Sequence, residues 1–261
     1  MFFRIILLLA SAAALLPASA WQERVNVRPG TKIKQLPATH LRYELSWNGR
    51  VKAGTVDLKF GLKDPRYQGY YVAQGWGGAT GWASALYPFT FSYTGFLNPK
   101  TLRPVQFHGV ETERGKKSTY KFRFRPGSAV GTKVRVKRGK SSTDQRKFTY
   151  QDPLDLFSGV LQVRSLPLQV GQEYRMPFQP VGRPYLAVIK VRGKENHLGR
   201  PALRMEVSLL RIAENGKLET YEKLKSSTLW LSDDAWKIPL EVRAKVYVGD
   251  VRMRLVGQEL L

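Results

Sequence analysis

Residues 41–49 read Leu-Arg-Tyr-Glu-Leu-Ser-Trp-Asn-Gly, so apolar and polar side chains alternate until an Asn-Gly pair ends the run. An alternation with a period of two is typical of a half-buried β-strand. Asn48 and Gly49 both tolerate a positive φ, which the tight two-residue turns of β-hairpins require. Residues 51–60 follow as the expected partner strand, so this part of the chain predicts a β-hairpin.

The same signals recur along the chain. Gly and Pro interrupt the alternating segments at short intervals, which favours a sheet-built architecture over a repeat of strands and helices. Further strands are expected at residues 70–75, 89–96, 105–113, 119–125, 133–137, 173–178, 185–191, 203–213, 221–231, 238–247 and 251–255. We therefore predict a mainly β fold, a single antiparallel and strongly curved sheet or open β-barrel.

One central helix is predicted in the middle of the chain. Asp152 is the expected N-cap, and Pro153 suits the first helical position, where a backbone N–H has no helical partner. Pro167 prevents the helix from continuing past residue 166. The apolar side chains that recur at helical spacing, and that we expect to plug an open end of the barrel, are Leu154, Phe157 and Leu161.

Residues 1–20 have the layout of a secretory signal peptide, with a positively charged start, an apolar run and small residues before the cleavage site. The apolar run of residues 5–16 would be about 18 Å long as a helix, too short for a hydrocarbon core of about 30 Å. No Cys follows it, so a lipid anchor is not expected. We expect cleavage after about Ala20. A flexible N-terminal arm over residues 21–39 and a single mostly-β domain over residues 40–261 would then form an exported, periplasmic protein without a transmembrane segment.

The composition points to anionic partners. The chain carries 43 Lys and Arg against 20 Asp and Glu, a formal charge of +23. Outside the cytoplasm the anionic candidates are lipid head groups, lipopolysaccharide phosphates and acidic wall polymers, whereas that compartment disfavours nucleic acid. The alternative is that the source organism simply makes basic exported proteins. The absence of Cys excludes thiol catalysis, Cys-based zinc sites and iron–sulfur clusters.

Catalytic signals are weak, and we predict no catalytic, cofactor or metal site. The three histidines lie far apart in sequence and lack neighbours at metal-ligand spacing: His40, His108 and His197. The acidic residues that would serve a hydrolase acting on envelope polymers are Asp152, Asp155, Asp233 and Asp234. Helix capping and turn formation account for the same four residues, so a hydrolase is the least favoured hypothesis.

A basic segment lies in the first half of the chain. Residues 111–147 contain 13 Lys and Arg against 3 Asp and Glu. If its alternating strands pair, their cations would line one face of a hairpin and form an anion-binding surface. That candidate surface consists of Lys121, Arg123, Arg125, Lys133, Arg135 and Lys137. The alternative is a solvated outer face that discourages aggregation between sheet edges.

An aromatic and glycine-rich segment precedes the basic one, with a short helix expected over residues 82–86. Glycines let a loop approach a ligand closely, and aromatic walls suit a lipid chain or a sugar face. The candidate wall for an apolar ligand consists of Trp76, Trp82, Tyr87, Phe89, Phe91 and Tyr93. The alternative is that these residues form the core of a curved sheet.

Several stretches together resemble the exported bacterial family labelled "domain of unknown function 3108". These stretches are residues 41–49 with Ala53-Gly54, residues 98–104, the helical segment 152–164, and Trp230 to Asp234 with Ile238-Pro239-Leu240. The resemblance implies a mostly-β envelope protein of Gram-negative-type bacteria, and it implies no activity. It supplies no catalytic or ligand residues.

The function expected from these features is that of a non-enzymatic exported envelope protein that binds an anionic or amphiphilic envelope component, such as an anionic lipid. An apolar chain would lie against the aromatic interior, and the basic hairpin would hold the anionic head. A structural or assembly factor that docks on an envelope partner through its sheet edges is the alternative. The sequence sets neither the ligand nor the oligomeric state.

Overall fold

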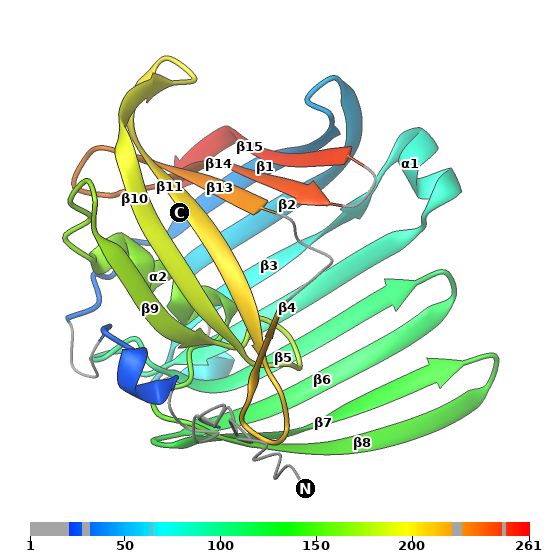
Figure 1. The fold of residues 1–261 in the computed structure, drawn as a ribbon. Coiled ribbons are helices and arrows are strands. Elements are labelled where there is room, and N and C mark those ends of the chain that lie inside the picture. The colour runs from blue at the N-terminus through cyan, green and yellow to red at the C-terminus, as the bar shows by residue number, and fades with distance from the viewer. Residues whose placement is uncertain (1–20, 28–31, 64, 221–225, 247–248) are drawn as a thin grey trace, which may run out of the picture.

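The computed structural model describes residues 21–27, 32–63, 65–220, 226–246 and 249–261, and the predicted signal peptide lies outside them. Fifteen strands of the described residues form one antiparallel sheet that curves around a helix (Figure 1). The predicted mainly β, open and curved architecture is therefore confirmed. No helix in the described part of the chain is long and apolar enough to cross a membrane.

The sheet consists of two meanders joined at their ends. The first contains β1 (Thr39–Trp47), β2 (Val51–Leu62), β3 (Tyr71–Ala79), β4 (Phe89–Leu97), β5 (Pro104–Glu113), β6 (Lys116–Arg125), β7 (Ser128–Lys137) and β8 (Lys140–Thr149). The second contains β9 (Glu173–Phe178), β10 (Tyr185–His197), β11 (Arg200–Ile212), β13 (Ser226–Ser232), β14 (Pro239–Val246) and β15 (Gly249–Leu260), with β12 (Leu218–Thr220) beside β11. Because β1 pairs with β15, the chain's first and last strands lie in the middle of the sheet. The sheet path then ends at β8 and β9, so the barrel is open between them.

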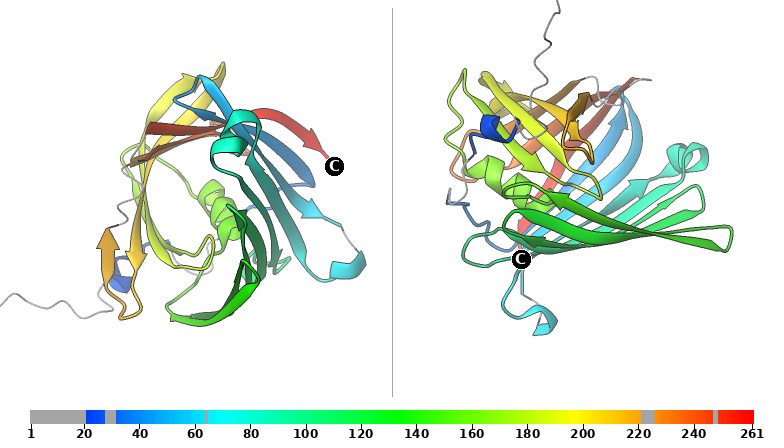
Figure 2. Two further views of the ribbon diagram at one scale, coloured as in Figure 1. Left: turned by 90° about the vertical axis from the view of Figure 1, so that its right-hand side faces the viewer. Right: turned by 60° about the horizontal axis from the view of Figure 1, so that its bottom comes forward.

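The chain crosses this opening through α2 (Leu156–Ser165), which lies inside the curve (Figure 2). The helix starts three residues later than predicted. Asp155, not Asp152, is the N-cap: its carboxylate accepts a hydrogen bond from the Ser158 N–H, and the Ser158 hydroxyl bonds the Asp155 backbone in return. Ser158 completes a capping box that Asp152 and Pro153 lack. The predicted stop before Pro167 is correct.

Three short helical segments complete the described elements: η1 (Gln22–Arg24), η2 (Pro65–Tyr67) and α1 (Gly81–Leu86). The last of these is the helix expected over residues 82–86. It joins β3 to β4 at the free end of that hairpin (Figure 1).

The core lies between the inner face of the sheet and α2. Phe157 of the helix makes ring contacts with Phe60 of β2 and Phe107 of β5, with centroids 6.1 and 6.5 Å apart. Gly75 and Gly95 face this ring, and a Cβ on Gly95 would lie 2.6 Å from it. These two glycines let the helix approach the sheet closely. Phe157 and Leu161 are buried as predicted, whereas Leu154 is buried just before the helix, in a backbone bridge to Phe178.

The described residues of the expected flexible N-terminal arm, 21–27 and 32–39, contribute buried side chains that pack against the barrel. The side chain of Trp21 is 6% exposed, and its indole N–H donates to the Gly216 carbonyl at 2.9 Å. Val27 belongs to the core around α2, and its N–H donates to the carbonyl of Arg175 in β9. Leu36 is also buried. Sparse apolar residues without periodicity anchor this segment, which is why alternation did not reveal it.

Turn chemistry explains one missed strand. Asn48 and Gly49 have φ values of 50° and 68°, as predicted for the first hairpin. Arg138 and Gly139 adopt nearly the same pair, 48° and 76°, and turn β7 back into β8. No strand was expected at residues 140–149, because Arg-Gly is a weaker turn signal than Asn-Gly. The strand expected at residues 221–231 begins at Ser226, and residues 221–225 lie outside the described chain.

Candidate functional site

The inner face of the first meander brings cations and tyrosines together, in an arrangement that corrects the predicted basic hairpin. Arg125 pairs with Ser128 across a two-residue turn, so each odd-numbered residue of β6 lies opposite an even-numbered residue of β7. The cations of the two strands therefore lie on opposite faces of the sheet. Lys133 lies opposite Tyr120, whose side chain points into the core, whereas Lys121 lies opposite Thr132. Side chains that share the inner face are Lys133, Arg135 and Lys137; those on the outer face are Lys121, Arg123 and Arg125.

A carboxylate organises the inner face beside these cations. Glu111 accepts hydrogen bonds from the hydroxyls of Tyr93 and Tyr120, at 2.6 and 2.7 Å. Burial raises the pKa of both tyrosine hydroxyls well above their ordinary value, and the nearby Glu111 carboxylate raises it further. Both tyrosines therefore remain neutral donors at any physiological pH. The ammonium of Lys133 lies 4.8 Å from the centroid of the Tyr120 ring.

Lys133 is an incompletely compensated cation. Burial lowers its pKa most, and the positive charges of Arg135, Arg146 and Lys116 lower it further, against the single opposing effect of Glu111. Arg146 lies on β8, opposite Gly131, and the side chains of these strands alternate so that it shares the inner face. An anion placed here would relieve the repulsion among these cations.

The predicted aromatic wall is divided between three places. Phe89, Phe91 and Tyr93 stack along the inner face of β4, with successive ring centroids 6.0 and 4.8 Å apart. Trp76 lies on the outer face, 5.8 Å from the ring of His40. The remaining two members, Trp82 and Tyr87, are exposed at α1. The six residues therefore do not form one wall. Trp76 follows the inward-facing Gly75 directly in β3, so its side chain points to the opposite face of the sheet.

An apolar cavity of about 160 Å³ lies on the other side of α2, mostly between the helix and the second meander, with Tyr43 of β1 and Leu58 of β2 also in its wall. Its lining contains no charged residue: Tyr43, Leu58, Gly159, Val160, Val163, Met176, Phe178, Ala187, Ile189, Val207, Leu209, Leu229, Leu231, Pro239, Val242 and Met253. Val160, Val207 and Leu229 are only partly buried, so the cavity wall is accessible. An engineered apolar cavity of about 150 Å³ stays dry and binds benzene, so this volume suits a short hydrocarbon segment.

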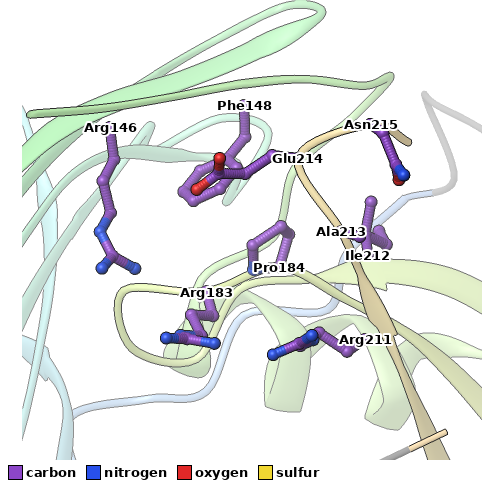
Figure 3. Close-up of a pocket in the computed structure, with 9 residues that line it drawn as sticks. All are labelled: Arg146, Phe148, Arg183, Pro184, Arg211, Ile212, Ala213, Glu214 and Asn215. Carbon is purple, nitrogen blue, oxygen red and sulfur yellow. The ribbon is translucent and has the colours of Figure 1, made fainter. Parts of the chain in front are cut away.

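A second cavity, of about 350 Å³, lies where the barrel is open, between β8 and β11 (Figure 3). Three arginines line it together with Phe148, Pro184, Ile212, Ala213, Glu214 and Asn215. Arg146 donates to the Gly182 carbonyl at 2.9 Å and to Asp144 at 2.7 Å, and Arg211 donates to Glu219 at 2.7 Å. The guanidinium of Arg183 makes no hydrogen bond or ion pair with the part of the chain that the structure describes, whereas its backbone N–H donates to the Val181 carbonyl at 2.8 Å.

The two cavities are neighbours along β11. Leu209 lines the apolar cavity and Arg211 lines the arginine cavity, and residues two apart on a strand lie on the same face about 7 Å from one another. An apolar surface therefore passes directly into one that carries guanidinium groups. Neither cavity was expected from the sequence, since the lining residues lie in ordinary alternating strands and come from segments as far apart in the chain as Tyr43 and Met253.

The acidic residues considered for hydrolysis have separate structural environments. Asp155 is fully buried at the helix N-terminus, and burial raises its pKa to about 6. Asp233 pairs with Lys194 at 2.8 Å, and the Asp234 carboxylate accepts the N–H groups of Trp236 and Lys237 and so holds a turn. Asp152 lies at a turn with φ 48°. Among the described residues no group of three or more His or acidic side chains has the arrangement of a metal site.

The fold and these cavities define an open, barrel-like antiparallel β protein with a helix inside and a partly hollow interior. The chain belongs to the family described as "Protein of unknown function (DUF3108)", whose sequence model matches residues 42–256. The resemblance seen in the sequence is thereby confirmed. No curated protein matches the chain.

Solved structures resemble this chain at low sequence identity. A β-barrel-like protein of domain of unknown function DUF1849 from Brucella abortus is 10% identical, with a TM-score of 0.58 over 87% of this chain and 99% of that one. A protein from Parabacteroides distasonis described as a "putative lipoprotein" is 5% identical, with a TM-score of 0.32 over 87% and 97% of the two chains. A protein from Bacteroides fragilis described as a "putative exported protein with YmcC-like fold" is 7% identical, with a TM-score of 0.31 over 87% and 98%. The first of these likenesses is one of fold.

Proposed function

We propose that this protein is a non-enzymatic, periplasmic envelope protein that binds an anionic amphiphile inside its open barrel. The apolar chain of the ligand occupies the cavity beside α2, and its head group lies at the arginine cavity and along the inner-face cations of β7 and β8. The proposal modifies the sequence-based idea of a basic hairpin surface, because only the inward-facing half of those cations lies inside the barrel.

The observation that carries the proposal is the direct passage from an uncharged cavity to a guanidinium-lined one along β11. Each methylene transferred from water into such a cavity contributes about 0.8 kcal/mol to binding. Charge-assisted hydrogen bonds from arginine to a carboxylate or phosphate then fix the position of the head group. Arg183 is available for such bonds without breaking an internal ion pair.

Mass spectrometry of organic extracts from the protein tests this directly. The mature protein is purified from its native envelope without detergent, and we expect a stoichiometric amphiphile with an acidic head group. The intact mass of the same sample shows whether the chain begins near Trp21. Extracts without a bound species would argue against the proposal.

A cavity-filling variant locates the ligand. Val207→Phe places a larger ring in the apolar cavity, and we expect it to abolish binding of a fluorescent fatty acid. Val130→Phe is the matched control, because Val130 is 45% exposed on the outer face and the same change there leaves the cavity untouched. Equal binding by the two variants would place the ligand elsewhere.

An assembly factor that docks through a sheet edge is the second candidate. β8 pairs only with β7 among the described strands, so its other edge is a free edge of the sheet. Exposed edges of this kind are templates for a strand from a partner. Crosslinking from β8 in the native envelope would recover that partner, and an empty interior in the extraction experiment would favour this candidate.

A further inference from the structure

Exposed apolar side chains gather at one end of the barrel. In α1, Trp82 is 48%, Leu86 67% and Tyr87, the next residue, 43% exposed, and no residue of this helix is buried. Val51, 43% exposed, lies at the start of β2. The two elements are joined there, since the Thr80 N–H donates to the Ala53 carbonyl at 3.0 Å. We call Val51, Trp82, Leu86 and Tyr87 the rim patch.

Cations border the rim patch. The Arg114 guanidinium lies 4.6 Å from the centroid of the Tyr87 ring, and Arg50 is exposed in the turn beside Val51. Lys52 is 59% exposed and pairs with Glu44. The Glu113 carboxylate, next to this helix, accepts hydrogen bonds from the Tyr87 hydroxyl and from the Lys116 ammonium, so its charge is already compensated.

We infer that the rim patch docks the protein on a lipid bilayer surface that carries anionic head groups. Trp and Tyr favour the boundary between hydrocarbon and head groups, where the ring is apolar and its polar atom stays hydrated. Lys and Arg beside them are attracted to anionic lipid. A second copy of this basic chain would bring like charges against the same cations, so the charge complementarity favours the membrane over self-association.

The place of the rim patch gives it access to the barrel interior. Phe89, two residues after Tyr87, begins the aromatic stack on the inner face of β4. Lys116 lies two residues after Arg114, and its positive charge is close enough to the inner-face cation Lys133 to lower the pKa of Lys133. The inference stands apart from the proposed function, because it rests on exposed rim residues that line neither cavity.

Vesicle co-sedimentation tests the inference. The full chain is mixed with vesicles of phosphatidylethanolamine and phosphatidylglycerol, and separately with phosphatidylcholine alone. We expect binding to the anionic vesicles only, weakened by salt. Trp82→Ser combined with Leu86→Ser should lower the bound fraction on the order of tenfold, because two apolar contacts with the bilayer are lost.

Trp236→Ser is the matched control. Trp236 is 50% exposed in the turn between β13 and β14, at the end of the barrel opposite α1, and we expect its loss to leave vesicle binding unchanged. Circular dichroism verifies that both variants fold. An equal loss in the two variants, no loss in either, or a dimer that the rim double variant dissociates in light scattering would overturn the inference. If extraction yields no amphiphile but the rim double variant still loses vesicle binding, only the proposed ligand fails.

Discussion

The two sides of α2 differ in how well they are filled. Toward the first meander, Phe157 and Leu161 pack against phenylalanines of the sheet, and glycines opposite them admit the ring. Toward the second meander, the helix presents Gly159, Val160 and Val163 to aliphatic strands and leaves a cavity. One side of the helix is therefore a filled core, and the other, the hollow side, is a core that contains a cavity of about 160 Å³. The difference shows that the size of the side chains at the helix, and not only the curvature of the sheet, determines where space remains beside the helix.

The largest effect expected from this comparison is on the filled side. Phe157→Ala removes a buried ring and should lower the free energy of unfolding by about 3–5 kcal/mol. Val160→Ala, on the hollow side, should cost less than about 1.5 kcal/mol because its side chain already borders a void. Urea denaturation of the two variants measures both values. Equal costs would mean that the two sides are packed alike.

The next effect concerns the buried cap of α2. The folded pKa of Asp155, about 6, lies above its ordinary value of 3.8, so the folded protein holds this proton more tightly. The stabilisation is complete below about pH 4 and is lost as the pH rises through about 6, a fall on the order of 3 kcal/mol. In Asp155→Asn, which retains a capping side chain, that fall should disappear.

Urea midpoints measured from about pH 4 to pH 7 test this behaviour. The wild-type protein should lose stability over this range more steeply than Asp155→Asn. Identical slopes in the two proteins would show that other groups cause the pH dependence.

The smallest effect is expected at the edge of the hollow side. Arg183→Ser breaks no internal ion pair, so the free energy of unfolding should change by less than about 0.5 kcal/mol. The affinity for an anionic amphiphile should fall about two- to fivefold, because Arg183 is largely exposed. Titration with a fluorescent fatty acid at low salt measures it. Arg125→Ser, on the outer face, is the control. A comparable fall in affinity in this variant would show that the effect comes from the net charge of the protein and not from the position of Arg183.

Much of the fold could be predicted from local pattern. The alternation of apolar and polar residues and the Asn48-Gly49 turn located the strands, because every second side chain of a strand lies on the buried face of the sheet and is apolar. The β6–β7 register was also accessible: the two-residue turn at Pro126-Gly127 fixes which residues face one another. The cations of both strands were assigned to one face without that constraint, and this is why the expectation of a single basic face was wrong.

The candidate site itself could not be read from the sequence. The apolar cavity exists because α2 places small residues opposite strands from both meanders. No local sequence pattern predicts how far the helix lies from those strands. Arg146 and Arg211 belong to opposite sides of the opening and face one cavity only through the curvature of the sheet. The capping box of Asp155 and Ser158 was visible as a pattern, yet Asp152-Pro153 offered a competing one.

The pairing of β1 with β15 sets the order in which this chain can be assembled. The register joins Thr39 to Leu260, so β1 can complete its pairing only after a segment synthesised about 220 residues later is available. Until then β1 presents a bare edge, which is the kind of surface that recruits the wrong strand from another chain. Contacts this distant in sequence also slow folding. The edge of β1 that faces β15 is therefore the part of this sheet that stays unprotected longest during synthesis.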